Sequence, residues 1–251
     1  MGNQGQRWPQ NKKADDRGRA PETPEAIGRA GTVNARGRVG VKSQQEIAFV
    51  RAALLFYAGV FAVALLVARW TGLPLVYASA EAAASGIDWW WDPIAGLAAA
   101  AFAVVATAGL TAATGWGDRL SRALAAILGP LSLRSCVLLA AVSGVAEEAL
   151  FRGAIQPRTG LLVASLLFGC VHFVPRRELL PWTAFTFVAG FGLGALYEAT
   201  GNLVAPVVAH AGVNAVNLRL LSRRALPVSL AAPRWRRSPP QRRGAGRPPA
   251  P

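Results

Sequence analysis

The sequence has few side chains that can carry acid–base or metal chemistry. It contains two histidines, two cysteines and one methionine in 251 residues. Cys136 and Cys170 both lie in apolar runs and match no metal-ligand or redox spacing, so free buried thiols are favoured over a disulfide framework. Acidic residues are also scarce, with 13 Asp and Glu against 27 Lys and Arg. Any catalytic site must therefore draw on a short list of side chains.

Apolar residues, in contrast, are abundant. They make up 53% of the sequence and charged residues only 16%, yet the net charge is +14. Charge must therefore be concentrated outside a large apolar mass, as in a membrane protein with basic tails. The first apolar run begins near residue 47 and is long enough to span a bilayer. We expect no cleaved signal peptide, because no shorter apolar run with a cleavage site precedes it.

The chain divides into four predicted regions. Residues 1–46 hold nine Lys or Arg and five acids without apolar periodicity, which predicts a disordered basic tail. Residues 47–132 predict two transmembrane spans and an interfacial helix over 118–128. Residues 133–220 predict a core of four helices, and 221–251 an Arg/Pro-rich disordered tail. The predicted fold is all-α, a polytopic membrane bundle of about six transmembrane helices.

Basic segments alternate with segments of little positive charge. Four of them fall on one side of the predicted spans: the two tails and the loops that carry Arg119, Arg122, Arg134, Arg176 and Arg177. By the positive-inside rule this side is cytoplasmic and both termini face it. The Ala/Arg/Pro-rich composition favours a bacterial origin, so we expect an integral protein of the plasma membrane. The tails are expected to contact the lipid bilayer and not nucleic acid.

Three consecutive tryptophans, Trp89, Trp90 and Trp91, precede the second predicted span. Such a run is typical of the aromatic belt at a membrane interface. A platform that stacks against a sugar ring is the alternative. We expect a membrane anchor.

The run Ala140–Gly153 contains two adjacent carboxylates, Glu147 and Glu148, together with Arg152. Ionisable residues inside a membrane helix mark a functional site by default. Glu148 and Arg152 are four residues apart and share a helix face, which predicts an ion pair. Glu147 is rotated by about 100 degrees from Glu148. It is left without that counter-ion in a desolvated place, as a general base requires.

Both histidines fall inside late apolar segments, at His172 and His210. A buried imidazole needs a polar partner, and the two carboxylates are the acidic candidates at comparable depth. Phe168 lies one turn before His172 and is placed to wall the site or to fix the ring. Asn214 lies one turn after His210, so an imidazole and an amide present donors from one face. Such a pair suits a developing oxyanion.

Three motifs together resemble a known family. They are EExxxR (Glu147, Glu148, Arg152), FxxxH (Phe168, His172) and HxxxN (His210, Asn214). In this order on three membrane helices they resemble the CPBP family of intramembrane proteases. That family includes the type II CAAX prenyl endopeptidases and bacterial relatives linked to bacteriocin self-immunity, such as lysostaphin resistance proteins. The resemblance covers about Leu133–Arg219.

The resemblance implies a role for each motif. These roles are water activation by Glu147 and His172, an oxyanion hole of His210 and Asn214, and support of the site by Glu148, Arg152 and Phe168. It implies a glutamic endopeptidase that needs no cofactor and no metal. The family was formerly classed as metalloproteases, and a zinc ion at Glu147, His172 and His210 is the alternative. The chain has no HExxH pair, and its histidines lie on different helices, which favours the metal-free mechanism.

Three other classes of function compete with a protease. In the first, the polar residues are a buried cluster that only stabilises a helix bundle. In the second, they belong to a proton-coupled transporter. In the third, they belong to a non-catalytic immunity or scaffold protein of the membrane. No inverted repeat or broken-helix pair supports a transporter. A pure binder has no evident need for both a base and an oxyanion hole. We expect a membrane-associated peptide or protein as substrate: a membrane-anchored peptide, a sorting tail or a bacteriocin-like precursor. A prenylated substrate would be unexpected in a bacterium.

Overall fold

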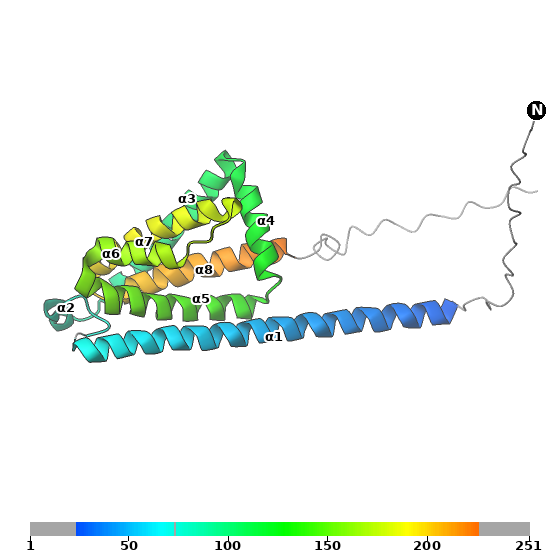
Figure 1. Cartoon of the computed structure of the whole chain (residues 1–251), viewed down its shortest axis with the longest axis horizontal. Coiled ribbons are helices and arrows are strands. Elements are labelled where there is room, and N and C mark those ends of the chain that lie inside the picture. The colour runs from blue at the N-terminus through cyan, green and yellow to red at the C-terminus, as the bar shows by residue number, and fades with distance from the viewer. Residues whose placement is uncertain (1–23, 73, 226–251) are drawn as a thin grey trace, which may run out of the picture. The chain divides into compact units, whose positions relative to one another are not determined.

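The computed structural model describes residues 24–72 and 74–225, and of residues 24–43 the backbone alone. Its elements are α1 (Pro24–Thr71), α2 (Ala80–Ser85), α3 (Trp91–Ala113), α4 (Trp116–Leu128), α5 (Leu133–Glu148), the π-helix η1 (Ala149–Ile155), α6 (Gln156–Val171), the 3₁₀-helix η2 (Arg177–Leu179), α7 (Leu180–Thr200) and α8 (Val204–Arg224) (Figure 1). Within these ranges the one β-type contact is an isolated bridge between Tyr77 and Asn202. The predicted all-α polytopic bundle is confirmed.

The first helix is longer than the sequence predicts. α1 begins at Pro24, within the segment 1–46 for which the sequence predicts a disordered tail. Proline is favoured at the first position of a helix, and no further proline interrupts the chain before Thr71. Once a helix is nucleated, each added residue gains one hydrogen bond, so helix extends from the apolar span into the polar sequence before it. The remaining parts of the two tails, 1–23 and 226–251, lie outside the described residues.

Five helical stretches in the described chain are long and apolar enough to cross a membrane. They are Gln44–Thr71, Trp91–Ala113, Leu133–Val171, Arg177–Thr200 and Val204–Arg224. The sequence predicts about six because it divides the third stretch in two. Most of their surface is not buried in the protein, with at most 33% of a window buried. Apolar helices with such exposed faces suit a lipid environment.

The third stretch reverses direction at Gly160, whose φ of 80° interrupts the helix. After this break α6 returns along α7 in the opposite sense. Its Gln156 Nε2 donates to the Gly194 carbonyl at 3.0 Å, while Ser165 packs against Gly190. The part of α6 after Gly160 spans only about 16 Å at the helical rise, less than the roughly 30 Å of a bilayer core. The third stretch is therefore divided at Gly160, as the sequence predicts, but the helix that follows is too short to cross a bilayer.

Basic and acidic residues gather at opposite ends of the bundle. α4 packs against both α8 and η2, and Arg224 Nη1 lies 2.8 Å from Asp118 Oδ1. The predicted basic loops around Arg122 and Arg177 therefore meet at one end. At the other end the segment before α3 joins the α7–α8 turn, where Leu203 N donates to the Val76 carbonyl at 3.0 Å. This end carries acids such as Asp88, Asp92 and Glu198.

From Glu46 onward α1 runs parallel to α5 (Figure 1). At the start, Glu46 Oε1 accepts hydrogen bonds from Ser132 N and Ser135 Oγ, both at 2.7 Å. Further along, Ala53 packs on a buried cluster that contains Leu139. Towards the end, Ala64 lies in one buried cluster with Ala149, Ala154, Tyr197 and Leu203. The contacts advance together along both helices, which fixes their register.

Candidate active site

Two neighbouring carboxylates lie in the interior of the bundle at the end of α5. Glu148 is 0% exposed and Glu147 9% exposed. The π-helix η1 begins directly after them, and single π-helical turns recur at functional sites. In η1 a Cβ atom on Gly153 would collide with the Leu75 carbonyl, so only glycine allows this approach of the α1–α2 segment. The sequence analysis missed the π-helix, because its residues are compatible with an ordinary α-helix.

Glu148 is the carboxylate with ionic partners. Its Oε1 accepts hydrogen bonds from Arg152 Nη1 at 3.0 Å and from His210 Nδ1 at 2.7 Å. Arg152 is 1% exposed, and its Nη2 also donates to the Gly190 carbonyl at 2.9 Å. The predicted ion pair is confirmed. A buried charge is tolerable when it is paired in this way, so these three side chains stabilise one another.

Glu147 faces two imidazoles without bonding to either. Its Oε2 lies 3.5 Å from His172 Nε2 and 3.9 Å from His210 Nε2. This oxygen is buried and has no hydrogen-bond partner among the described residues. His172 Nδ1 donates to the Phe168 carbonyl at 2.7 Å, so in the neutral ring Nε2 is an acceptor. A carboxylate oxygen and an imidazole nitrogen thus lie close enough together for one water molecule beside them to donate a hydrogen bond to each.

Phe168 packs against most of the polar groups of the site. Its ring centroid lies 4.6 Å from that of His172 and 5.9 Å from that of His210. The Arg152 guanidinium carbon lies 4.6 Å from the same centroid, in a cation–π contact. These contacts are compatible with both predicted roles, a wall of the site and a support that fixes the His172 ring. Trp182, which the sequence analysis did not single out, contacts His172 from the other side at 5.6 Å between ring centroids.

Asn214 lies on α8, which packs against α5, and its amide is held by a serine of α5. Asn214 Nδ2 donates to Ser143 Oγ at 2.9 Å. Ser143 is buried and donates in turn to the Ala140 carbonyl at 3.2 Å. The expected pair of donors is therefore brought to one region, with Asn214 held by a serine that the sequence analysis missed. The sequence feature that indicates Ser143 is its hydroxyl, which lies one helical turn before Glu147 in an apolar run.

The described His, Cys, Asp and Glu side chains form no group of three that is placed to hold a metal ion. Both alternatives from the sequence, a metal-free site and a zinc ion at Glu147, His172 and His210, stay predictions.

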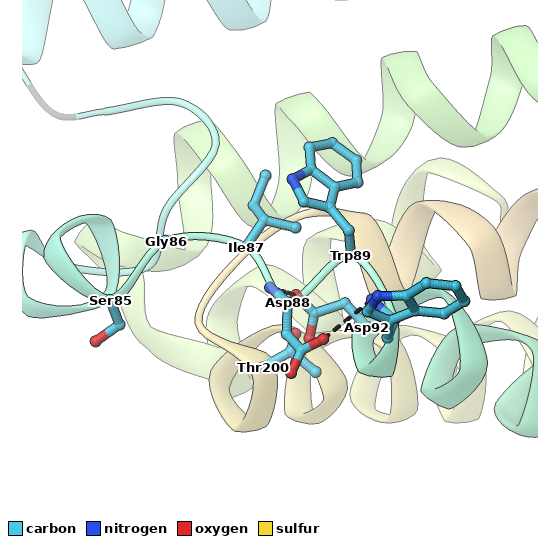
Figure 2. Close-up of a pocket in the computed structure, with 8 residues that line it drawn as sticks. Ser85, Gly86, Ile87, Asp88, Trp89, Asp92 and Thr200 are labelled. Carbon is cyan, nitrogen blue, oxygen red and sulfur yellow. Dashed lines mark hydrogen bonds between the residues drawn. The ribbon is translucent and has the colours of Figure 1, made fainter.

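A cavity of about 590 Å³ lies away from these residues, at the acidic end of the bundle (Figure 2). It is lined by the segment that leads into α3 and by Thr200. Trp89 and Trp90 are both exposed at its edge, as a membrane anchor requires. Asp92 at its base is buried and accepts a hydrogen bond from Asn202 Nδ2 at 2.7 Å.

Comparisons with known proteins point to one family. The family profile of type II CAAX prenyl endopeptidase Rce1-like proteins matches residues 129–216. Uncharacterized protein YpbD of Bacillus subtilis (strain 168) is 41% identical over 92 residues, which make up 36% of this chain and 47% of YpbD. The chain thus spans about half the length of that relative. No solved structure matches the chain significantly.

The matched region contains the whole polar cluster. It extends from the turn before α5 into α8 and includes Glu147, Glu148, Arg152, Phe168, His172, His210 and Asn214. These side chains are brought together from three helical segments in the order that the motifs predict. Residues 129–216 are therefore similar to the Rce1-like family of type II CAAX prenyl endopeptidases.

Proposed function

We propose that this protein is an intramembrane endopeptidase that hydrolyses a peptide bond of a membrane-associated peptide or protein. The observation that carries the proposal is Glu147 Oε2, a buried acceptor without a hydrogen-bond partner among the described residues, which faces two imidazole nitrogens. The Rce1-like domain supports a peptidase. The five apolar helical stretches support a site within the membrane.

Water activation falls to Glu147 and His172. A water molecule between Glu147 Oε2 and His172 Nε2 loses a proton to the carboxylate as its oxygen attacks the substrate carbonyl carbon. The carbonyl π-bond opens and its electron pair becomes the oxyanion of a tetrahedral intermediate. When the intermediate collapses, the carbon–nitrogen bond breaks and Glu147 returns the proton to the leaving amine. One water is consumed, and the carboxylate is regenerated.

The oxyanion is stabilised by His210 and Asn214. His210 Nδ1 donates to Glu148, so its Nε2 can donate a second hydrogen bond only when the ring is positively charged. Glu148, which also pairs with Arg152, stabilises that charge. Asn214 uses one N–H of its amide on Ser143 and keeps the other for the oxyanion. Preorganised donors of this kind are the largest single contribution in many hydrolases.

Access to the site is proposed from the basic end of the bundle. α6 ends at Val171, and the chain from His172 to η2 leaves the helix beside the site and leads to the end where α4 lies. Non-helical backbone at membrane depth requires protein or water around it, so this segment marks the wet side. By the positive-inside rule we assign this end and both termini to the cytoplasm, in a bacterial plasma membrane.

The test is cleavage of a membrane-peptide library by the purified protein in detergent, with and without a strong chelator. Wild type is expected to cleave, unaffected by chelation, whereas Glu147→Gln and His172→Ala are expected to be inactive. Loss of activity on chelation, with recovery in zinc, would contradict the metal-free mechanism. If folded wild type cleaves no member of the library, the endopeptidase proposal fails in favour of a non-catalytic immunity or scaffold role.

A further inference from the structure

We propose that Ser143 and Tyr57 are positioning residues of this site, two hydroxyl groups that hold the Asn214 amide and the Glu147 carboxylate in their working orientations. The inference rests on the proposed function and extends it to a helix outside the Rce1-like domain. Neither hydroxyl is assigned a contact with the reacting atoms. Each acts through the side chain that it holds.

Ser143 has a defined place in the hydrogen-bond network. Its hydroxyl is the acceptor for Asn214 Nδ2 at 2.9 Å, and its own proton goes to the Ala140 carbonyl at 3.2 Å. Gly144, the next residue, brings α5 so close to α8 that an added Cβ would meet Ala211 N at 3.1 Å. An amide can rotate about its last side-chain bond unless a partner fixes it. Ser143 is that partner, so it decides where the second N–H of Asn214 points.

The register of α1 on α5 brings Tyr57 to the same level. Ala53 packs on the cluster that contains Leu139, and Ala64 lies in one cluster with Ala149. Tyr57 stands between these two points on α1, opposite the turn that holds Ser143 and Glu147. The helix packing thus places Tyr57 at the level of both side chains.

The composition of α1 makes the position of Tyr57 unusual. Between Arg51 and Arg69, Tyr57 is the one residue whose side chain can form a hydrogen bond. A tyrosine hydroxyl away from water normally finds a partner, and the partners available to it here are side chains of the site. In this proposal Tyr57 donates to one oxygen of the Glu147 carboxylate, while Oε2 faces His172. The base and the oxyanion amide are thereby linked through two hydroxyls.

The experiment compares kinetics of Ser143→Ala, Tyr57→Phe and Asn214→Ala with a control, Ser222→Ala. Ser222 is as buried as Ser143, but it contacts Cys136 at the basic end and touches no residue of the site. Steady-state kcat and KM are measured on a peptide that wild type cleaves, and thermal unfolding reports the fold of each variant. Ser143→Ala and Tyr57→Phe misplace catalytic groups without removing them. In these two variants kcat is therefore expected to fall roughly 10- to 100-fold with little change in KM.

A double variant separates positioning from structure. If Ser143 acts through Asn214, adding Ser143→Ala to Asn214→Ala lowers kcat no further, whereas two independent effects would multiply. Unchanged kcat in folded Ser143→Ala and Tyr57→Phe, or full multiplication in the double variant, overturns the inference and leaves the endopeptidase proposal standing. Failure of wild type to cleave overturns both. If Ser143→Ala does not fold, Tyr57→Phe decides alone, since it removes one oxygen from a half-buried side chain.

Discussion

Two buried polar clusters of the molecule differ in how completely they are hydrogen bonded. At the acidic end, Asp92 is 3% exposed and Asn202 1% exposed. Asp92 Oδ2 accepts from Asn202 Nδ2 at 2.7 Å and from Asp88 N at 3.1 Å. Asn202 Oδ1 accepts from Val204 N at 2.9 Å. This cluster joins the start of α3 to the α7–α8 turn with each of these groups in a bond.

The central cluster is as deeply buried but incompletely bonded. Among the described residues, Glu147 Oε2 and Glu148 Oε2 have no hydrogen-bond partner. Burial of an acceptor without a partner costs free energy, so a fold keeps such a group where the group serves a further purpose. The comparison separates a polar cluster whose groups are bonded to one another from one that keeps acceptors without a partner, as the proposed water-binding site requires.

The largest effect is expected from Glu147→Gln in the central cluster. The variant keeps the shape of the side chain but removes the base, so the cleavage rate is expected to fall by about 10²- to 10⁴-fold. Thermal unfolding is expected to stay close to that of wild type, because Gln keeps the shape of the side chain and Glu147 Oε2 accepts no hydrogen bond from the described residues. Initial rates on a cleaved peptide, together with unfolding curves, check both statements. Turnover at the wild-type rate would rule out Glu147 as the base.

Arg152→Ala tests the paired half of the same cluster. It leaves Glu148 buried without its guanidinium partner, which costs about 3 to 5 kcal/mol of folding free energy. The expected result is a strong loss of folded protein in membranes, measured by the yield of monodisperse protein after extraction. Normal accumulation of this variant would show that the ion pair at 3.0 Å contributes little.

Asp92→Ala tests the fully bonded cluster. It removes the acceptor for the buried amide of Asn202, and the unfolding free energy is expected to fall by about 1 to 3 kcal/mol. The cleavage rate per folded molecule is expected to match that of wild type, because Asp92 lies away from the proposed site. A selective loss of rate without loss of stability would erase the distinction between the two clusters.

The smallest effect is expected from an exposed ion pair at the basic end. Arg224, which donates to the Asp118 carboxylate, and the nearby charge of Arg122 lower the pKa of Asp118. The stability from this lowered pKa is therefore present above the ordinary aspartate pKa of about 3.9 and is lost as the pH falls through the lowered value. Melting temperatures of wild type and Asp118→Asn are expected to differ slightly at neutral pH and to converge in acid. A gap that widens in acid would reverse this sign.

Local spacing predicted part of the site correctly. Glu148 and Arg152 are four residues apart, and an α-helical face brings such a pair together whatever surrounds it. The two histidines in apolar segments predicted polar partners, because desolvated imidazoles need them. Both expectations depend on short-range geometry or on a desolvation cost, and the structure confirms the ion pair and the proximity of Glu147 to both rings.

The remaining features depend on tertiary packing that one sequence does not specify. Which carboxylate holds His210 is decided by the rotation of α8 against α5, and the structure pairs His210 with Glu148. Ser143 reaches Asn214 through the packing of α5 on α8, which leaves no sequence motif. The helical start at Pro24 was missed because polar composition was interpreted as disorder. The interfacial helix expected over 118–128 is present as α4, since its boundaries follow from glycines at both ends.

The central claim is that Glu147 activates the attacking water while Glu148 maintains the fold. It is tested most directly by the cleavage rate per folded molecule of Glu147→Gln, measured beside wild type and Asp92→Ala on one peptide substrate. The account predicts a folded and inactive Glu147→Gln protein beside an Asp92→Ala protein that is less stable but fully active. A folded Glu147→Gln protein that cleaves as fast as wild type would contradict it.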